Sequence, residues 1–176
     1  RHDVDLEKVG EVADLPADAS PIQLMASGQV DNFSFTVIGR IRYEWEQGSW
    51  NEWHLLYNNQ RSGWLSDAQL EYAISVLTPP PFQLPNPRQI KRGQSFSFHG
   101  ADFIVTHKTK ARYAGFEGEL PFRTDDRSET VFADLRSYDG RFATIDYSEN
   151  PPLLFTGRFV TFDELKLQGL REFEGW

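Results

Sequence analysis

The strongest constraint on the fold is a regular alternation of side chains between Phe33 and Trp45. Large apolar residues occupy nearly every second position, and mostly polar residues occupy the positions between them. Because successive side chains of a strand point to opposite faces, this period of two predicts a long, half-buried β-strand. Gly39 interrupts the apolar face and predicts a bulge or bend, at which the strand curls around a small barrel or divides in two.

Shorter segments of the same kind follow along the chain. Extended segments are expected at 50–57, 64–65, 72–76, 96–98, 103–113, 129–138, 142–147 and 154–160. The pair Asp139-Gly140 predicts a tight two-residue hairpin turn. Thr161-Phe162-Asp163-Glu164 has the pattern of a capping box and predicts a short C-terminal helix. The expected fold class is therefore all-β and mainly antiparallel.

Five prolines between Pro79 and Pro87 divide this pattern. Proline cannot donate to strand pairing, so the segment indicates a semi-rigid connector. The series from Phe35 to Tyr43 also resembles the series from Phe103 to Tyr113, which indicates an internal duplication. We therefore expect two related small β-barrel or SH3-like halves, at 28–78 and 92–176, which can pack as one domain and are joined by a connector at 79–91.

Residues 1–27 are acidic, contain two prolines and show no sustained period. They are expected to form an N-terminal linker or extension, with one helical turn around Asp5–Val12. The chain begins at Arg1 rather than at a methionine, so we expect a fragment or a processed form.

Composition excludes several classes of function. The 176 residues include no cysteine, so disulfides, thiolate zinc sites and cysteine nucleophiles are excluded, and a reducing, cytoplasmic location is expected. No apolar run reaches the roughly 20 residues of a membrane span, so no membrane insertion is expected. A formal net charge of −8 repels phosphate backbones, so nucleic acid is not an expected partner.

The chain lacks the common catalytic motifs. It has no glycine-rich phosphate loop, and Gly93-Gln94-Ser95-Phe96-Ser97 lacks the final glycine of a nucleophile elbow. The four histidines lie far apart in the sequence and have no zinc-site spacing. No cofactor and no metal are therefore expected, and a binding protein is favoured over an enzyme.

Two segments are candidate polar sites. In Trp50-Asn51-Glu52-Trp53-His54, strand alternation puts Trp50, Glu52 and His54 on one face, where a carboxylate beside an imidazole can perform acid–base chemistry. The alternative is a core Trp53 with a solvated or cross-strand Glu52–His54 pair. Glu117 and Glu119 alternate along a second segment and can bind a cation, or can simply be exposed.

Aromatic side chains provide a further test. If Trp50, Trp64 and Trp176 are not all in cores, an exposed aromatic patch favours protein or ligand binding. The alternative is that these rings fill the barrels.

The ordered series Phe35-Thr36-Val37-Ile38-Gly39, then Trp50 to Tyr57, then Gly63-Trp64-Leu65 resembles the domain of unknown function 4178 family (DUF4178). Gly118-Glu119, Asp134 and Gly157-Arg158-Phe159-Val160 extend the resemblance, which covers about Gly28 to Leu167. The resemblance implies no established reaction. It implies a bacterial cytoplasmic accessory protein, often encoded near phage-shock-protein-A-like membrane-stress proteins and polyamine aminopropyltransferase-like enzymes. Many members carry an N-terminal Cys-x-x-Cys zinc ribbon, for which this chain has no cysteine.

These features favour three candidate functions. The first is a non-catalytic binding or scaffold module for a protein partner in a membrane-stress system. The second is a polyamine-binding protein or enzyme that uses Glu52, His54, Glu117 and Glu119. The third is self-association through an unpaired strand edge.

Overall fold

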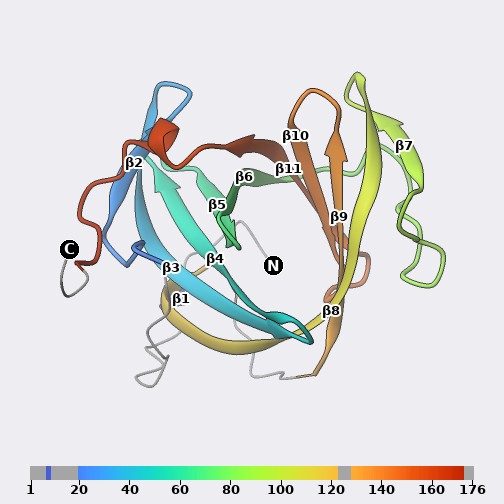
Figure 1. The fold of residues 1–176 in the computed structure, drawn as a ribbon, viewed down its shortest axis with the longest axis horizontal. Coiled ribbons are helices and arrows are strands. Elements are labelled where there is room, and N and C mark those ends of the chain that lie inside the picture. Colours follow the sequence, from blue (N-terminus) through green and yellow to red (C-terminus); the bar gives the residue numbers. More distant parts are fainter. Residues whose placement is uncertain (1–6, 9–19, 123–127, 173–176) are drawn as a thin grey trace.

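The computed structural model of the chain describes residues 7–8, 20–122 and 128–172. Within these ranges the regular structure is antiparallel β-strand apart from one short 3₁₀ turn, which confirms the predicted fold class (Figure 1). The elements are β1 (Glu7–Lys8), β2 (Ser27–Val30), β3 (Phe33–Trp45), β4 (Gly48–Tyr57), β5 (Ser62–Ala68), β6 (Glu71–Thr78), β7 (Ser95–Phe98), β8 (Ala101–Leu120), β9 (Thr130–Ser137), β10 (Arg141–Asp146), β11 (Leu153–Val160) and η1 (Asp163–Leu165).

In the described part of the chain, eight of these strands close into one barrel. Strands β3 to β6 form one meander and strands β8 to β11 form another. The first strands of the two meanders pair with each other, β3 with β8, and so do the last strands, β6 with β11. Both segments that the sequence separated at the proline-rich connector therefore contribute strands to a single closed ring.

The predicted bulge at Gly39 is confirmed, and it lies where β3 meets both neighbours. The pairing of β3 with β4 shifts register between Val37 and Gly39. A Cβ atom on Gly39 would lie 2.1 Å from the backbone oxygen of Glu119, so only glycine lets β8 approach this closely.

Buried apolar side chains form three clusters. One lies inside the ring and includes Tyr43, Trp64 and Phe155. The other two cover the outward surfaces of the two meanders. Each of these outer clusters contains one isoleucine from the segment preceding the meander, Ile22 in the first and Ile90 in the second. The strands are thus buried on both faces over much of their length.

We call these covering segments the first arm (residues 20–30) and the second arm (residues 88–98). Each arm ends in a short strand, β2 or β7, that forms a hairpin with the first strand of its meander. Figure 1 shows β2 and β7 on opposite sides of the molecule, with the C-terminal segment beside β2.

Three local predictions need correction. The C-terminal helix is only the 3₁₀ turn η1, although the capping box is present: the Thr161 N–H donates to Glu164 Oε1 over 3.0 Å, and the Glu164 N–H donates to Thr161 Oγ1 over 3.2 Å. The short N-terminal helix is wrong at Glu7–Lys8, which pair with β8 as a strand, and the rest of that segment lies outside the described residues.

The third correction concerns the hairpin between β9 and β10. Its loop has three residues, 138–140, rather than two. Gly140 takes a φ of 88°, whereas Asp139 is not among the residues with positive φ. A type I turn closed by a left-handed glycine is the common solution for a three-residue loop.

Candidate functional site

The interior of the ring contains a cavity of about 550 Å³, lined by side chains from all eight ring strands. Strand alternation explains its walls, because every second residue points inward. Strand β4 contributes Trp50 and Glu52, β9 contributes Asp134, and β10 contributes Thr144 and Asp146. The cavity is thus walled by aromatic rings and lined by four carboxyl groups, those of Glu52, Asp134 and Asp146 inside and that of Glu71 at its border.

The Asp134 carboxyl group has a perturbed pKa. Burial raises its pKa above the ordinary value, and a hydrogen bond from the Thr144 side chain opposes the shift. The charges of His107 and Arg136 also lower its pKa, while that of Glu71 raises it. Asp134 lies directly opposite Thr144 on β10 and opposite His107 on β8. A carboxyl group that is costly to ionise and faces a cavity is a candidate for ligand binding.

The other two carboxyl groups inside the cavity are held by local contacts. The Trp50 indole Nε1 donates to Glu52 Oε2 over 2.9 Å. Asp146 is only 1% exposed, and its Oδ1 accepts a hydrogen bond from the backbone N–H of Ser148 over 2.9 Å. Both side chains are therefore fixed in orientation at the cavity wall.

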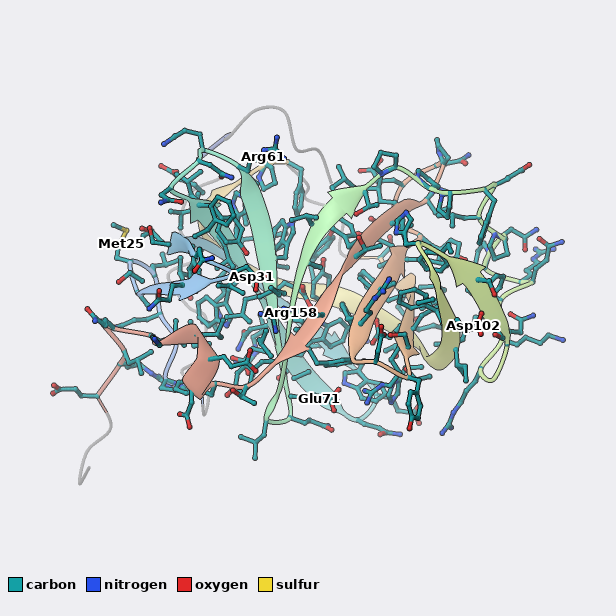
Figure 2. All side chains as sticks on the ribbon, turned by 90° about the horizontal axis from the view of Figure 1, so that it is seen from above. Met25, Asp31, Arg61, Glu71, Asp102 and Arg158 are labelled. Carbon is teal, nitrogen blue, oxygen red and sulfur yellow. The ribbon has the colours of Figure 1, made fainter. Side chains whose placement is uncertain are left out.

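An ion pair marks one border of the cavity. Arg136 Nη2 lies 2.7 Å from Glu71 Oε1, and its guanidinium lies over the Phe159 ring, 4.4 Å from the centroid. Glu71 is labelled at the edge of the molecule in Figure 2. An open, largely apolar groove, which includes Leu70 and Tyr72, begins beside this pair. The positive charge of Arg136 is thus balanced at the border.

The structure separates the residues of the first candidate segment. Trp50, Glu52 and His54 do share one face, as predicted, but only Trp50 and Glu52 line the cavity. His54 is fully buried and stacks on Trp64, with ring centroids 4.9 Å apart. Trp53 faces the other way and lies in the first outer cluster.

Both ring nitrogens of His54 have partners. Nδ1 lies 2.8 Å from the backbone oxygen of Glu119, and Nε2 lies 3.1 Å from Ser62 Oγ. Because a carbonyl oxygen only accepts, Nδ1 must donate in this bond. The imidazole thus contacts a backbone carbonyl and a serine hydroxyl on β8 and β5.

Glu117 and Glu119 lie away from the cavity. The Glu117 carboxylate is half-buried and lies 2.8 Å from Arg40 Nη1, whose guanidinium also donates to Asn51 Oδ1. The Glu119 side chain is exposed, and only its backbone oxygen reaches His54. Between them Gly118 takes a φ of 70°, which breaks regular strand alternation. Trp176, the remaining aromatic candidate, lies outside the described residues.

Sequence reasoning alone missed the cavity role of Asp134 and Asp146. Each lies an even number of positions after an aromatic residue on its own strand, Asp134 after Phe132 and Asp146 after Phe142. That pattern places acid and ring on one face. It does not reveal that this face lines the inside of a barrel, because the opposite face of each strand is also apolar.

Residues 7–8, 20–122 and 128–172 hold no group of three or more histidine, aspartate or glutamate side chains arranged to hold a metal ion. In the same ranges, no helical segment is long and apolar enough to cross a membrane.

Together, the ring and its interior define an antiparallel β-barrel protein whose aromatic-walled cavity carries both carboxyl and basic side chains. The chain belongs to the family described as Domain of unknown function (DUF4178), which matches residues 24–162. The match confirms the resemblance over most of the chain. No curated protein and no solved structure matches the chain.

Proposed function

We propose that this chain is a non-catalytic binding module whose barrel cavity takes a small organic cation, with a polyamine as the specific candidate. The observation that carries the proposal is the placement of Glu52, Asp134 and Asp146 in one aromatic-walled cavity. Its volume of about 550 Å³ falls in the range usual for small-molecule sites.

The chemistry of the walls suits an alkylammonium ligand. Ammonium groups form charge-assisted hydrogen bonds to carboxylates, and they are attracted to the faces of aromatic rings. Trp50 and Phe132 lie at the cavity with ring centroids 5.9 Å apart. A flexible chain of methylene groups can pack against such rings while its amines reach the acids.

Basic residues also border the cavity, but they are paired with an acid or exposed, which leaves carboxyl groups inside for a positively charged ligand. Arg136 is paired with Glu71. Arg92 and Lys108 are exposed, and Lys108 Nζ donates to the backbone oxygen of Pro87, on the second arm's side of β8. Among the described residues, the cavity lining thus carries four carboxyl groups (Glu52, Glu71, Asp134 and Asp146) and three arginine or lysine side chains.

Isothermal titration calorimetry with spermidine at low salt tests the proposal. We expect measurable heat of binding, and we expect Asp134→Asn to weaken affinity by about tenfold, because one charge-assisted contact is lost. Glu119→Gln is the matched control, since it removes an exposed carboxylate outside the cavity, and it should leave affinity unchanged. No heat at millimolar spermidine contradicts the proposal.

A role for a protein partner is proposed alongside, because a barrel that binds a ligand inside leaves its outer surface available. The specific observation that favours it is the outer edge of β7, to which no described residue bonds. The partner would be a protein of a membrane-stress system, as the family resemblance implied.

A further inference from the structure

The two arms repeat the same backbone geometry at a spacing of 68 residues. In the first arm, the Met25 N–H donates to the Val37 oxygen over 2.8 Å, and the Val37 N–H donates to the Ala26 oxygen over 2.8 Å. Adding 68 to each number gives the bonds of the second arm. There, Gly93 N–H donates to the Val105 oxygen over 2.8 Å, and Val105 N–H donates to the Gln94 oxygen over 2.9 Å.

Other features keep this spacing. The buried Ile22 corresponds to the buried Ile90. The register shift after Val37 in β3 corresponds to the register shift after Val105 in β8. Positions in one arm can therefore be compared directly with positions in the other.

The outer edge of the first arm is covered by the chain's own C-terminal segment. Ser27 N–H donates to the Gln168 oxygen over 3.0 Å, and Gln168 N–H donates to the Ser27 oxygen over 2.8 Å. Farther along, the Arg171 N–H donates to the Pro21 oxygen over 2.8 Å. Residues 168–171 thus cross the first arm antiparallel to it, with one isolated bridge at Ser27–Gln168 and a bend at Gly169.

Among the described residues, none covers the corresponding edge of the second arm. Ser95 corresponds to Ser27: it pairs with Ile104 on β8 as Ser27 pairs with Thr36 on β3. Alternate residues of an antiparallel strand turn their N–H and C=O groups away from the neighbouring strand. Those of Ser95 therefore point outward, as those of Ser27 do, and no residue in the described ranges bonds to them across this edge.

The second arm carries basic side chains at positions where the first arm has none. Arg88 and Lys91 correspond to Ser20 and Gln23, and Arg92 corresponds to Leu24. All three basic side chains are exposed, and Arg92 also lines the barrel cavity. A segment lying here would meet Arg88 near the place where Arg171 lies on the first arm, so like charges would repel an arginine at that position.

An apolar contact is available beside the edge. Phe82 is 39% exposed and stacks on Phe96 of β7, with centroids 6.1 Å apart. Figure 2 shows Asp102, on the β7–β8 hairpin, at the opposite end of the molecule from Met25 on the first arm. The open edge is thus remote from the C-terminal segment that covers its counterpart.

We propose that the outer edge of the second arm docks an extended, acidic segment of a partner protein, which adds at Ser95 in the way that residues 168–171 add at Ser27. Backbone pairing supplies the attachment, as in other cases of strand addition. Arg88 and Lys91 select acidic side chains, and Phe82 takes an apolar one. This surface lies on the outside of the barrel, so the inference does not depend on a ligand in the cavity.

The test uses the full chain, labelled with nitrogen-15, and a synthetic peptide with the sequence of residues 163–172. Two forms of the peptide are compared, the unaltered sequence and the same sequence with Arg171→Glu. We expect the amide resonances of Ser95 and Ser97 to shift. At low salt the altered peptide should bind about fivefold more tightly, and this advantage should shrink at high salt.

Two variants of the protein locate the contact. Ser95→Pro removes the outward N–H but no bond to β8, and proline is tolerated at the first residue of a strand. It should weaken peptide binding by about tenfold while thermal unfolding is unchanged. Ser95→Ala keeps the N–H and should bind as the unaltered protein does.

Three results would overturn the proposal. One is no resonance shift at millimolar peptide. Another is a shift at Ala26 and Ser27 instead of Ser95, which would show exchange with the chain's own C-terminal segment. The third is equal or tighter binding of the unaltered peptide, which would point to a second copy of this chain rather than to an acidic partner.

Discussion

At the scale of single residues, strand alternation predicted correctly which face of the strand each side chain occupies. It did not predict whether that face is buried. It placed Trp50, Glu52 and His54 on one face and Trp53 on the other, as the structure has them. It did not show that both faces of β4 are buried, so it offered His54 as a solvated or acid–base group. The fully buried imidazole instead contacts a backbone oxygen of β8, and that contact depends on ring closure far along the sequence.

Asp134 should cost the folded state stability at neutral pH. Because burial raises its pKa, the folded protein holds this proton more tightly than the unfolded chain does. Protonated Asp134 thus adds to the free energy of unfolding at acid pH, and this stabilisation is lost as the pH rises through the raised pKa. Asp134→Asn should stabilise the protein by about 1 kcal/mol at pH 7, since a partly buried charge is removed.

Thermal unfolding of both proteins across the acid-to-neutral range measures this difference. The advantage of Asp134→Asn should shrink as the pH is lowered, because wild-type Asp134 is then protonated too. A variant that is less stable at pH 7 would show that the carboxylate is favourably paired in the fold.

Gly39 supports the closest approach between β3 and β8. Gly39→Ala should destabilise the protein by about 3 kcal/mol or more, because its Cβ would collide with the backbone oxygen of Glu119. Ser34→Ala, an exposed position on the same strand, should change stability by less than about 0.5 kcal/mol. Denaturant unfolding measures both, and equal effects would mean that β8 moves away at little cost.

At the scale of elements, local patterns found nearly every strand and the bulge at Gly39. Local patterns did not predict how long an element is or which distant segment it pairs with. The capping box at Thr161 formed, yet it starts only three residues of 3₁₀ turn, because Lys166 takes a left-handed conformation and Gln168 then bonds to the first arm. The spacing of 68 residues extends the internal likeness that the sequence indicated only through the series Phe35 to Tyr43 and Phe103 to Tyr113.

The C-terminal segment should stabilise the first arm through Leu165, which is fully buried in the outer cluster. Leu165→Ala should destabilise the protein by about 2–4 kcal/mol through the cavity left behind. Leu70→Ala, which truncates a leucine that is 89% exposed, is the matched control and should have little effect.

Hydrogen exchange at Ser27 reports the same contact locally. Exchange at this amide should quicken in Leu165→Ala, because Ser27 bonds to the segment that Leu165 holds in place. Unchanged protection at Ser27 would mean that the segment is held independently of Leu165.

At the scale of the whole molecule, closure is the property that the sequence did not predict. No local pattern says that β3 pairs with β8 and β6 with β11, since these partners are separated by more than 60 positions in the chain. Closure makes two meanders into one barrel and turns Glu52, Asp134 and Asp146 toward a shared interior. The cavity is therefore a product of long-range pairing rather than of any motif.

The most direct test of the cavity proposal is the titration of the Asp134 carboxyl group by carbon-13 NMR, with and without spermidine. The free protein should show a pKa raised above the ordinary aspartate value, as burial requires. Bound spermidine should lower that pKa, because an ammonium group beside the carboxyl favours its ionised form. An Asp134 titration that saturating spermidine leaves unchanged would contradict a cation site in the barrel.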